Sequence, residues 1–157
     1  MHSKLYLHRD IKAHNVMLYV NDSGRLGAKL ADLGTAVLMP SLEATISEPI
    51  GTTGYAAPDI FSPDGYGWSA DIYSLGVLMW ETLCGSAERA ADNPLTGLHP
   101  DLAVTQINSG VRPAFNDDDH PEDIRSVISK AWSTQPSERP TASQISASLR
   151  DILGIDD

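Results

Sequence analysis

The sequence predicts a mainly α-helical domain that carries one small β-hairpin near its N-terminal end. A strong turn sequence, NDSG at 21–24, separates two β-prone segments. From about residue 69 onward, apolar residues recur at helical spacing. Between these parts, residues 35–58 are rich in Pro, Gly, Ser and Thr, which indicates a long loop. A chain of 157 residues, 41% of them apolar, is long enough for one packed core.

The hairpin is expected over about residues 16–31, with NVMLYV and LGAKLAD as its strands. The first long helix is expected from Ser69 to Cys84, and Gly85 is suited to end it. Thr141 is suited to cap the last helix. The remaining elements are a short helix over 100–110, an acidic turn over 115–123, and helices over 121–134 and 141–153.

Composition argues against several classes of function. The net charge of −10 and the presence of only four lysines disfavour broad nucleic-acid binding, which needs clustered cations. The sequence has no run of about 18 apolar residues, so it contains no predicted membrane segment. The single cysteine, Cys84, cannot form an internal disulfide, and the simplest expectation is a reducing, cytoplasmic location. The residues His2, His14, His99 and His120 lack metal-site spacing and are expected at the surface.

Residues with catalytic potential are concentrated in two short motifs, HRDIKAHN at 8–15 and DLG at 32–34. Together they contain Asp10, Lys12, Asn15 and Asp32. Phosphoryl transfer needs a carboxylate beside the acceptor hydroxyl, a cation near the phosphate, and oxygen ligands for magnesium. The four side chains supply that set. The alternative interpretation is a charged surface loop without catalytic function.

The first motif resembles the catalytic loop of eukaryotic protein kinases, and DLG is similar to their magnesium-binding turn, with Leu33 in place of Phe. Three further segments resemble kinase motifs in the same order: GTTGYAAPD at 51–59, DIYSLGVLMWETLCG at 71–85, and W-x-x-Q-P-x-x-R-P-T at 132–141. This resemblance covers nearly the whole chain. It implies a protein-kinase-like C-lobe, a partial kinase domain over 1–157, divided into a catalytic loop (8–15), a magnesium turn (32–34), an activation segment (32–59) and a helical lobe (69–153).

The resemblance also implies roles for the four central side chains. Asp10 would orient the substrate hydroxyl and accept its proton. Lys12 would contact the transferring phosphate of ATP. Asn15 and Asp32 would bind Mg²⁺. The substrate would be a protein, with phosphate transferred to a Ser or Thr hydroxyl.

Supporting roles are implied for five more residues. Thr52 would bond near Asp10, and Asp71 would brace the backbone of the catalytic loop. Arg9 would pair with a phosphorylated residue of the activation segment. The phosphorylated residue would be Ser41, Thr45, Ser47 or Thr53. The alternative interpretation is that these hydroxyl groups are ordinary polar side chains of a loop. Asp59 stands where the family has Glu, so its ion pair with Arg139 is expected to be strained or bridged by water.

Two features point to a subgroup within this resemblance. Lys12 and the pair Gly51–Thr52 are typical of serine/threonine kinases. The segments INSGVRP and W-x-x-Q-P-x-x-R-P-T are similar to the tyrosine-kinase-like branch of those enzymes. We therefore expect a serine/threonine kinase of this branch.

The sequence contains no G-x-G-x-x-G motif, and none of its lysines lies in a V-A-I-K-like strand. The resemblance therefore implies a kinase domain without its N-terminal lobe, and we expect little phosphoryl transfer by the chain alone. Two functions stay open: a serine/threonine kinase, or a non-catalytic binding or scaffold module of the pseudokinase type. The lone lobe would expose the surface that faces the small lobe, so we expect either a partner that covers it or aggregation. A metal-dependent hydrolase is a third alternative, disfavoured by the absence of histidine-ligand spacing.

Overall fold

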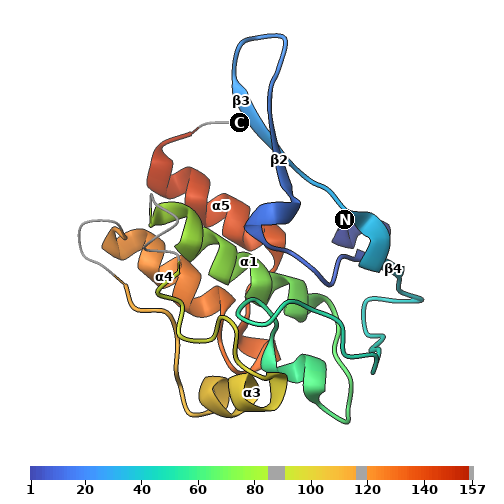
Figure 1. Ribbon diagram of the computed structural model, residues 1–157. Helices are drawn as coiled ribbons and strands as arrows, with labels where there is room; N and C mark the ends of the chain where they lie inside the picture. The colour runs from blue at the N-terminus through green and yellow to red at the C-terminus, as the bar shows by residue number, and fades with distance from the viewer. Residues whose placement is uncertain (85–90, 116–119, 156–157) are drawn as a thin grey trace.

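Four α-helices make up most of the regular secondary structure in a computed structural model that describes residues 1–84, 91–115 and 120–155. The helices are α1 (Trp68–Leu83), α3 (Pro100–Asn108), α4 (Glu122–Ala131) and α5 (Ala142–Leu153). Helix α1 packs against α4, and α4 packs against α5, whereas α3 lies apart beside the 3₁₀ helix η4 (Pro58–Phe61) (Figure 1). The predicted mainly helical fold class is confirmed.

Helix α1 is the centre of the core because it is buried on nearly all sides. Tyr73, Val77 and Trp80 are at most 3% exposed and join the main apolar cluster. A Cβ atom on Gly76 would lie 3.0 Å from Cβ of Ala131, so the glycine permits the close approach of α1 and α4. A helix that is apolar all round is expected in such a buried position.

The helix ends agree closely with the sequence predictions. Helix α1 begins one residue before the predicted Ser69, and α4 ends at Ala131, three residues earlier than predicted. Thr141 caps α5 in a capping box with Gln144, as its side chain accepts a hydrogen bond from the Gln144 amide. The proposed helix end at Gly85 and residues 116–119 of the predicted acidic turn lie outside the described residues.

The predicted hairpin consists of β2 (Val16–Val20) and β3 (Leu26–Leu30), paired antiparallel with Val16 opposite Leu30. At its turn, Oδ1 of Asn21 accepts hydrogen bonds from the amides of Ser23 and Arg25, and Gly24 adopts a left-handed φ of 75°. The hairpin extends away from the helices (Figure 1), and most of its side chains are exposed. The turn residues Asn21 and Gly24 thus account for the position of the turn between the two strands.

The prediction of an unbroken loop over 35–58 is wrong. Strand β4 (Val37–Leu38) pairs antiparallel with β1 (Tyr6–Leu7), and Ile46 forms an isolated bridge with Tyr66. These pairings join segments far apart in sequence, so no local pattern indicates them. They accompany burial of Leu7 (0% exposed) and Met39 (1%), whose apolar surface supplies the driving force.

The prediction of surface positions for the histidines is wrong for His120, which is 1% exposed. Its ring stacks on Trp80 with centroids 6.1 Å apart, and it meets Phe115 edge-on. An imidazole can be buried this way because its carbon edges are apolar while Nε2 keeps a polar partner, here the Trp80 carbonyl at 3.2 Å.

Within the described ranges, no helix is both long and apolar enough to span a membrane.

Replacing Ile128 by Ala tests the interface of α1 and α4. Ile128 is 0% exposed, and its truncation should lower the free energy of unfolding by about 2–5 kcal/mol, as is typical of buried large-to-small changes. Leu102→Ala is the matched control, because Leu102 is 46% exposed. Urea denaturation followed by circular dichroism measures both. Equal stability of the two variants would contradict this view of the core.

Candidate functional site

The loop at 8–15 is attached to α1 through one buried carboxylate, that of Asp71, which is 2% exposed. Its Oδ2 accepts a hydrogen bond from the His8 amide at 2.8 Å, and its Oδ1 accepts one from the Arg9 amide at 2.9 Å. His2 Nε2 also lies 2.9 Å from Oδ2. Arg9 has a left-handed φ of 71°, an uncommon conformation for a side chain of its size. The two hydrogen bonds from backbone amides to Asp71 fix the backbone around Arg9.

The next segment along the chain is joined to the same loop by His8, whose side chain is completely buried. Its Nε2 lies 3.1 Å from the carbonyl of Ala31, and the hydroxyl of Thr35 donates to the His8 carbonyl at 2.9 Å. The Ala31 amide donates to the Asn15 carbonyl at 2.8 Å. Asp32, which follows Ala31 directly, is therefore held beside the loop.

The carboxylate of Asp10 is the centre of a compact polar cluster. Its Oδ2 lies 2.7 Å from Lys12 Nζ, and its Oδ1 accepts a hydrogen bond from the Thr52 hydroxyl at 2.5 Å. Lys12 Nζ also donates to Thr52 Oγ1 at 2.9 Å. Thr52 thus comes from 42 residues further along the chain and contacts both charged groups. The structure brings together three predicted site residues in a triangle of direct contacts.

The electrostatics of this cluster keep Asp10 ionised. Partial burial alone would raise the pKa of Asp10, because burial penalises the charged form. Hydrogen bonds from Lys12, Thr52 and Asn15, together with the positive charge of Lys12, outweigh that effect and lower its pKa below the ordinary 3.8. At neutral pH the group is therefore a carboxylate, able to accept a proton from a hydroxyl.

Asn15 and Asp32 offer oxygen atoms of the kind that magnesium prefers. Asn15 is buried, and its Nδ2 donates to the Asp10 carbonyl at 2.8 Å and to Asp10 Oδ2 at 3.0 Å. Because the amide nitrogen makes both bonds, the amide oxygen stays available as a ligand. Asp32 is exposed, and its Oδ1 accepts a bond from the Gly34 amide at 3.2 Å.

Within the part of the chain that the structure describes, no group of three or more His, Cys, Asp or Glu side chains is arranged for a metal. Magnesium in phosphoryl-transfer sites is typically bound by one or two protein groups, with phosphates and waters completing its shell. Asn15 and Asp32 fit that requirement. A fully protein-coordinated structural metal does not fit it.

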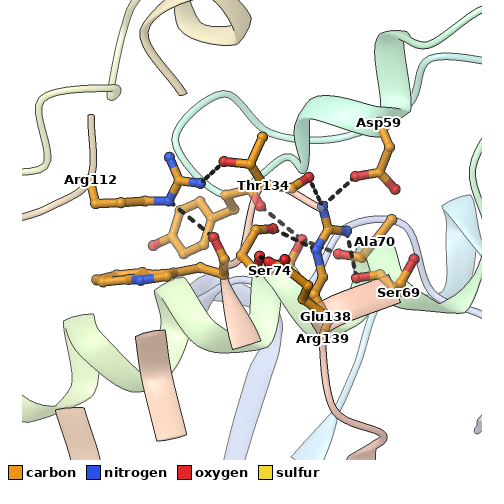
Figure 2. A network of polar contacts seen from close by, with 11 residues as sticks. Asp59, Ser69, Ala70, Ser74, Arg112, Thr134, Glu138 and Arg139 are labelled. Atoms are coloured by element: carbon orange, nitrogen blue, oxygen red, sulfur yellow. Dashed lines mark hydrogen bonds and ion pairs between the residues drawn. The ribbon is translucent and has the colours of Figure 1, made fainter. Parts of the chain in front are cut away.

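The expected ion pair of Asp59 with Arg139 is present. Arg139 Nη2 contacts Asp59 Oδ1 directly at 2.6 Å, so of the two expectations, strain or a bridging water, the contact needs no water (Figure 2). The short side chain reaches with only one oxygen, and Asp59 Oδ2 is buried without a partner among the described residues. Carbonyls of Ser69, Ser133 and Thr134 satisfy the rest of the guanidinium, which explains how the shorter acid is tolerated.

Arg112, which lies in the INSGVRP segment but received no role of its own from the sequence, forms a second network beside Arg139 (Figure 2). Its Nε donates to the Trp132 carbonyl at 3.0 Å, and its Nη2 donates to the Thr134 hydroxyl at 2.8 Å. The Tyr73 ring lies 5.5 Å from the Arg112 guanidinium and 5.2 Å from that of Arg139. Because most of these partners are backbone carbonyls, no sequence pattern could have identified them.

Beside the Asp10 cluster is a cavity of about 690 Å³ lined by Lys12, Asn15, Thr52, Tyr55 and Glu81, among others. The Tyr55 hydroxyl donates a short hydrogen bond to Glu81. Burial, followed by the negative charge and bond of Glu81, raises the pKa of Tyr55 far above its ordinary value. Sequence analysis missed this pair, although Tyr55 and Glu81 stand inside two of the motifs.

The Arg9 guanidinium lies against the segment that follows β4. Its Nη1 contacts Glu48 Oε2 at 2.8 Å, and its Nε donates to the Thr35 carbonyl at 2.5 Å. Pairing of Arg9 with a phosphorylated residue of the activation segment stays a prediction.

Changing Asp71 to Asn should weaken the attachment of the loop. The charged group accepts two hydrogen bonds from backbone amides, and a neutral amide would replace it. This change should lower the free energy of unfolding by about 2–4 kcal/mol, given the usual contribution of hydrogen bonds to charged groups. The control is Asp64→Asn at an exposed position, expected to change stability by less than about 0.5 kcal/mol. Denaturant titration compares the two. An unaltered midpoint for Asp71→Asn would contradict the role assigned to this carboxylate.

Removing the charge of Lys12 should raise the pKa of Asp10. In the native protein the lowered pKa contributes stability that is present above pH 3.8 and is lost as pH falls through the lower folded value. In Lys12→Met, burial should dominate and raise the pKa of Asp10 above 3.8, so the ionised carboxylate should no longer contribute stability at neutral pH. Carboxyl ¹³C NMR titration measures this shift. Lys29→Met is the control, since Lys29 lies over the Tyr19 ring in the hairpin.

The comparisons with known proteins agree with this geometry. The protein kinase domain family model matches residues 1–149. The chain is 32% identical over 147 residues to the serine/threonine-protein kinase zyg-8 of Caenorhabditis elegans, covering 92% of this chain and 18% of that protein. It is 28% identical over 152 residues to the serine/threonine-protein kinase STY46 of Arabidopsis thaliana, covering 97% of this chain and 24% of that protein.

A third relative is the calcium/calmodulin-dependent protein kinase cmkA of Emericella nidulans, 31% identical over 165 residues, with 98% of this chain and 38% of that protein covered. The chain therefore spans well under half the length of these curated relatives. The match of the family model covers nearly all of the sequence, including the Asp10 cluster, Asp32 and Arg139. The chain belongs to the protein kinase domain family, and its relatives are serine/threonine kinases.

Proposed function

We propose that these residues form the C-lobe of a serine/threonine kinase that transfers the γ-phosphate of ATP to a Ser or Thr hydroxyl of a protein substrate. The observation that carries this proposal is the contact of Thr52 with both Asp10 and Lys12. It joins the proposed activation segment (32–59) to the proposed catalytic loop (8–15) at the carboxylate itself. A surface loop without catalytic function would have no reason to assemble these groups from distant segments.

In the proposed reaction Asp10 orients the substrate hydroxyl and accepts its proton as the oxygen bonds to the γ-phosphorus of ATP. The bond from that phosphorus to the bridging oxygen breaks, and ADP leaves with the electron pair. Its lowered pKa favours the carboxylate form that this step needs. Lys12, 2.7 Å from Asp10, would offset negative charge on the transferred phosphoryl group. Thr52 would hold the two side chains in place through a hydrogen bond with each of them.

Asn15 and Asp32 are the proposed ligands of Mg²⁺ associated with ATP. Bound magnesium would neutralise charge on the phosphates. The Asn15 amide is oriented by its bonds to Asp10, and Asp32 is held near it through Ala31. The sequence contains no glycine-rich loop, so residues outside these 157 would have to enclose the phosphates. For this reason we expect the chain alone to transfer phosphate very slowly.

The proposed kinase would belong to the tyrosine-kinase-like branch and would act in a reducing, cytoplasmic compartment. The INSGVRP and W-x-x-Q-P-x-x-R-P-T segments favour the tyrosine-kinase-like branch. The buried position of the single cysteine, Cys84, is compatible with a reducing, cytoplasmic location.

The second candidate function is a binding or scaffold module, and an exposed apolar surface favours it. Met17, Leu18, Val20 and Leu26 of the hairpin are 64–71% exposed. Next to them lies a groove of about 570 Å³ formed by apolar side chains of the hairpin, α1 and α5, including Leu18, Leu75, Leu78, Leu83, Leu149 and Leu153. We propose that a partner, the small lobe of a kinase or another protein, covers this surface.

Asp10→Asn separates the two candidates. The substitution is made in the endogenous product, and the size of that product is measured first with an antibody to residues 141–157. The enzyme proposal predicts that the substitution lowers phosphoryl transfer about 10²–10⁴-fold, the usual contribution of a general base. Asp22→Asn, in the exposed hairpin turn, is the control and should keep full activity. Transfer of ³²P from ATP to a Ser/Thr peptide library measures both. Equal transfer by the two variants, or none by the wild-type product, would favour the binding module.

A further inference from the structure

The short turn over residues 52–55 carries Thr52, whose hydroxyl donates a hydrogen bond to Asp10 at 2.5 Å. The Thr52 carbonyl accepts hydrogen bonds from the amides of Tyr55 and Ala56, each at 3.0 Å. These bonds tie the two ends of the turn together. A contact at any residue of the turn therefore also affects where Thr52 lies.

The turn is bonded to Asn93, an asparagine from the segment between α1 and α3 that is only 6% exposed. Its Nδ2 donates to the Gly54 carbonyl at 3.2 Å, and its Oδ1 accepts a hydrogen bond from the Leu95 amide at 3.0 Å. The Asn93 carbonyl accepts a further bond from the Thr96 amide at 3.1 Å. Leu95 is 0% exposed and belongs to the main apolar cluster. Asn93 is thus fixed by its own segment, with its amide nitrogen directed at the turn.

The close approach of the two segments depends on Gly54. Its φ of 96° lies in the left-handed region, which residues with a side chain rarely adopt. A Cβ atom there would lie 3.1 Å from Oγ1 of Thr96 and 3.5 Å from Nδ2 of Asn93. Any side chain at this position would strain the backbone and crowd Thr96. The two segments therefore match in shape as well as in hydrogen bonding.

Helix α1 holds the end of the same turn, and Asn93 holds its middle. The Ser74 hydroxyl donates to the Tyr55 carbonyl at 2.9 Å, and the Tyr55 hydroxyl donates to Glu81. Neither contact involves the carbonyl of Gly54, which belongs to a buried residue. A buried carbonyl without a donor is costly, so the bond from Asn93 favours this one position of the turn.

We propose that Asn93 is a positioning residue that holds the turn over 52–55, and through it the Thr52 hydroxyl, against Asp10. Asn93 also lines the cavity beside the Asp10 cluster. It lies outside all five sequence motifs, so the sequence assigned it no role. The importance of Thr52 for phosphoryl transfer rests on the proposed function. The coupling of Asn93 to Asp10 is a property of the folded chain and is testable without ATP.

The test is a titration of Asp10 by carboxyl ¹³C NMR. The Thr52 hydroxyl is one of the groups that lower the pKa of Asp10, so a displaced turn should raise that pKa. Thr52→Val removes the hydroxyl and gives the full rise available by this route. Asn93→Ala should produce at least about a third of that rise. Asn108→Ala, at an exposed position in α3, is the matched control and should leave the titration unchanged.

A double-mutant cycle shows whether Asn93 acts through Thr52. When Thr52→Val is already present, adding Asn93→Ala should raise the pKa of Asp10 no further, because the hydroxyl is gone. A purely structural asparagine would lower the free energy of unfolding without this dependence on Thr52. Urea denaturation of the same variants measures the unfolding free energy separately.

If Asn93→Ala does not fold, the wild type decides. Protonated Asp10 accepts a weaker hydrogen bond from Thr52, and this change should reach Asn93 through the turn. The ¹⁵N–¹H signal of the Asn93 side-chain amide should therefore shift with the same midpoint pH as the Asp10 carboxyl. The side-chain amide of Asn108 is the control and should not follow that midpoint.

An unchanged Asp10 titration in Asn93→Ala would overturn the proposal. So would an equal rise in pKa with and without the Thr52 hydroxyl, or an Asn93 signal that does not follow Asp10. None of these measurements depends on catalysis. A chain that transfers no phosphate would leave this inference standing, and a failed coupling would leave the proposed phosphoryl transfer untouched.

Discussion

The buried carboxylate of Asp71 is the interaction on which the arrangement of the site depends. It lies in the first turn of the central helix and accepts hydrogen bonds from two backbone amides of the loop that carries Asp10 and Lys12. A charge that is 2% exposed is stable only when its oxygens are satisfied, and here His2 and the two amides satisfy them. The direction of the loop is therefore determined by α1, the most buried helix of the fold.

Side chains with polar or charged ends connect the other segments to this loop. His8 joins it to Ala31, Thr52 joins it to the segment that follows β4, and Arg9 joins it to Glu48. Each contact is directional and short, so it sets position more narrowly than apolar burial could. The left-handed backbone at Arg9 shows the same constraint, because an uncommon conformation persists where surrounding bonds over-determine it.

A similar rule governs the second polar network, which includes the Ser69 carbonyl at the start of α1. Arg139 is completely buried at its side chain and bonds three carbonyls besides Asp59. Arg112 likewise uses mainly carbonyls. Such arginines connect helix ends and loops that are distant in the sequence. Their loss would leave several carbonyls unsatisfied at once, which makes them structural rather than catalytic in character.

The order of five motifs was sufficient to predict the protein kinase family, and local patterns predicted the hairpin, the helices and the Thr141 cap. These features depend on neighbours within a few residues, and turn or capping chemistry is read directly from such neighbours. The pairing of β1 with β4, the burial of His120 and the direct contact of Asp59 with Arg139 depend on residues more than 25 positions apart. The roles of Asp10, Lys12, Asn15 and Asp32 in catalysis stay predictions. The sequence by itself determined which side chains are available for phosphoryl transfer. Only the tertiary structure decided that Glu48 occupies Arg9 and that Thr52 meets Asp10, because long-range contacts arise when packing brings distant segments together.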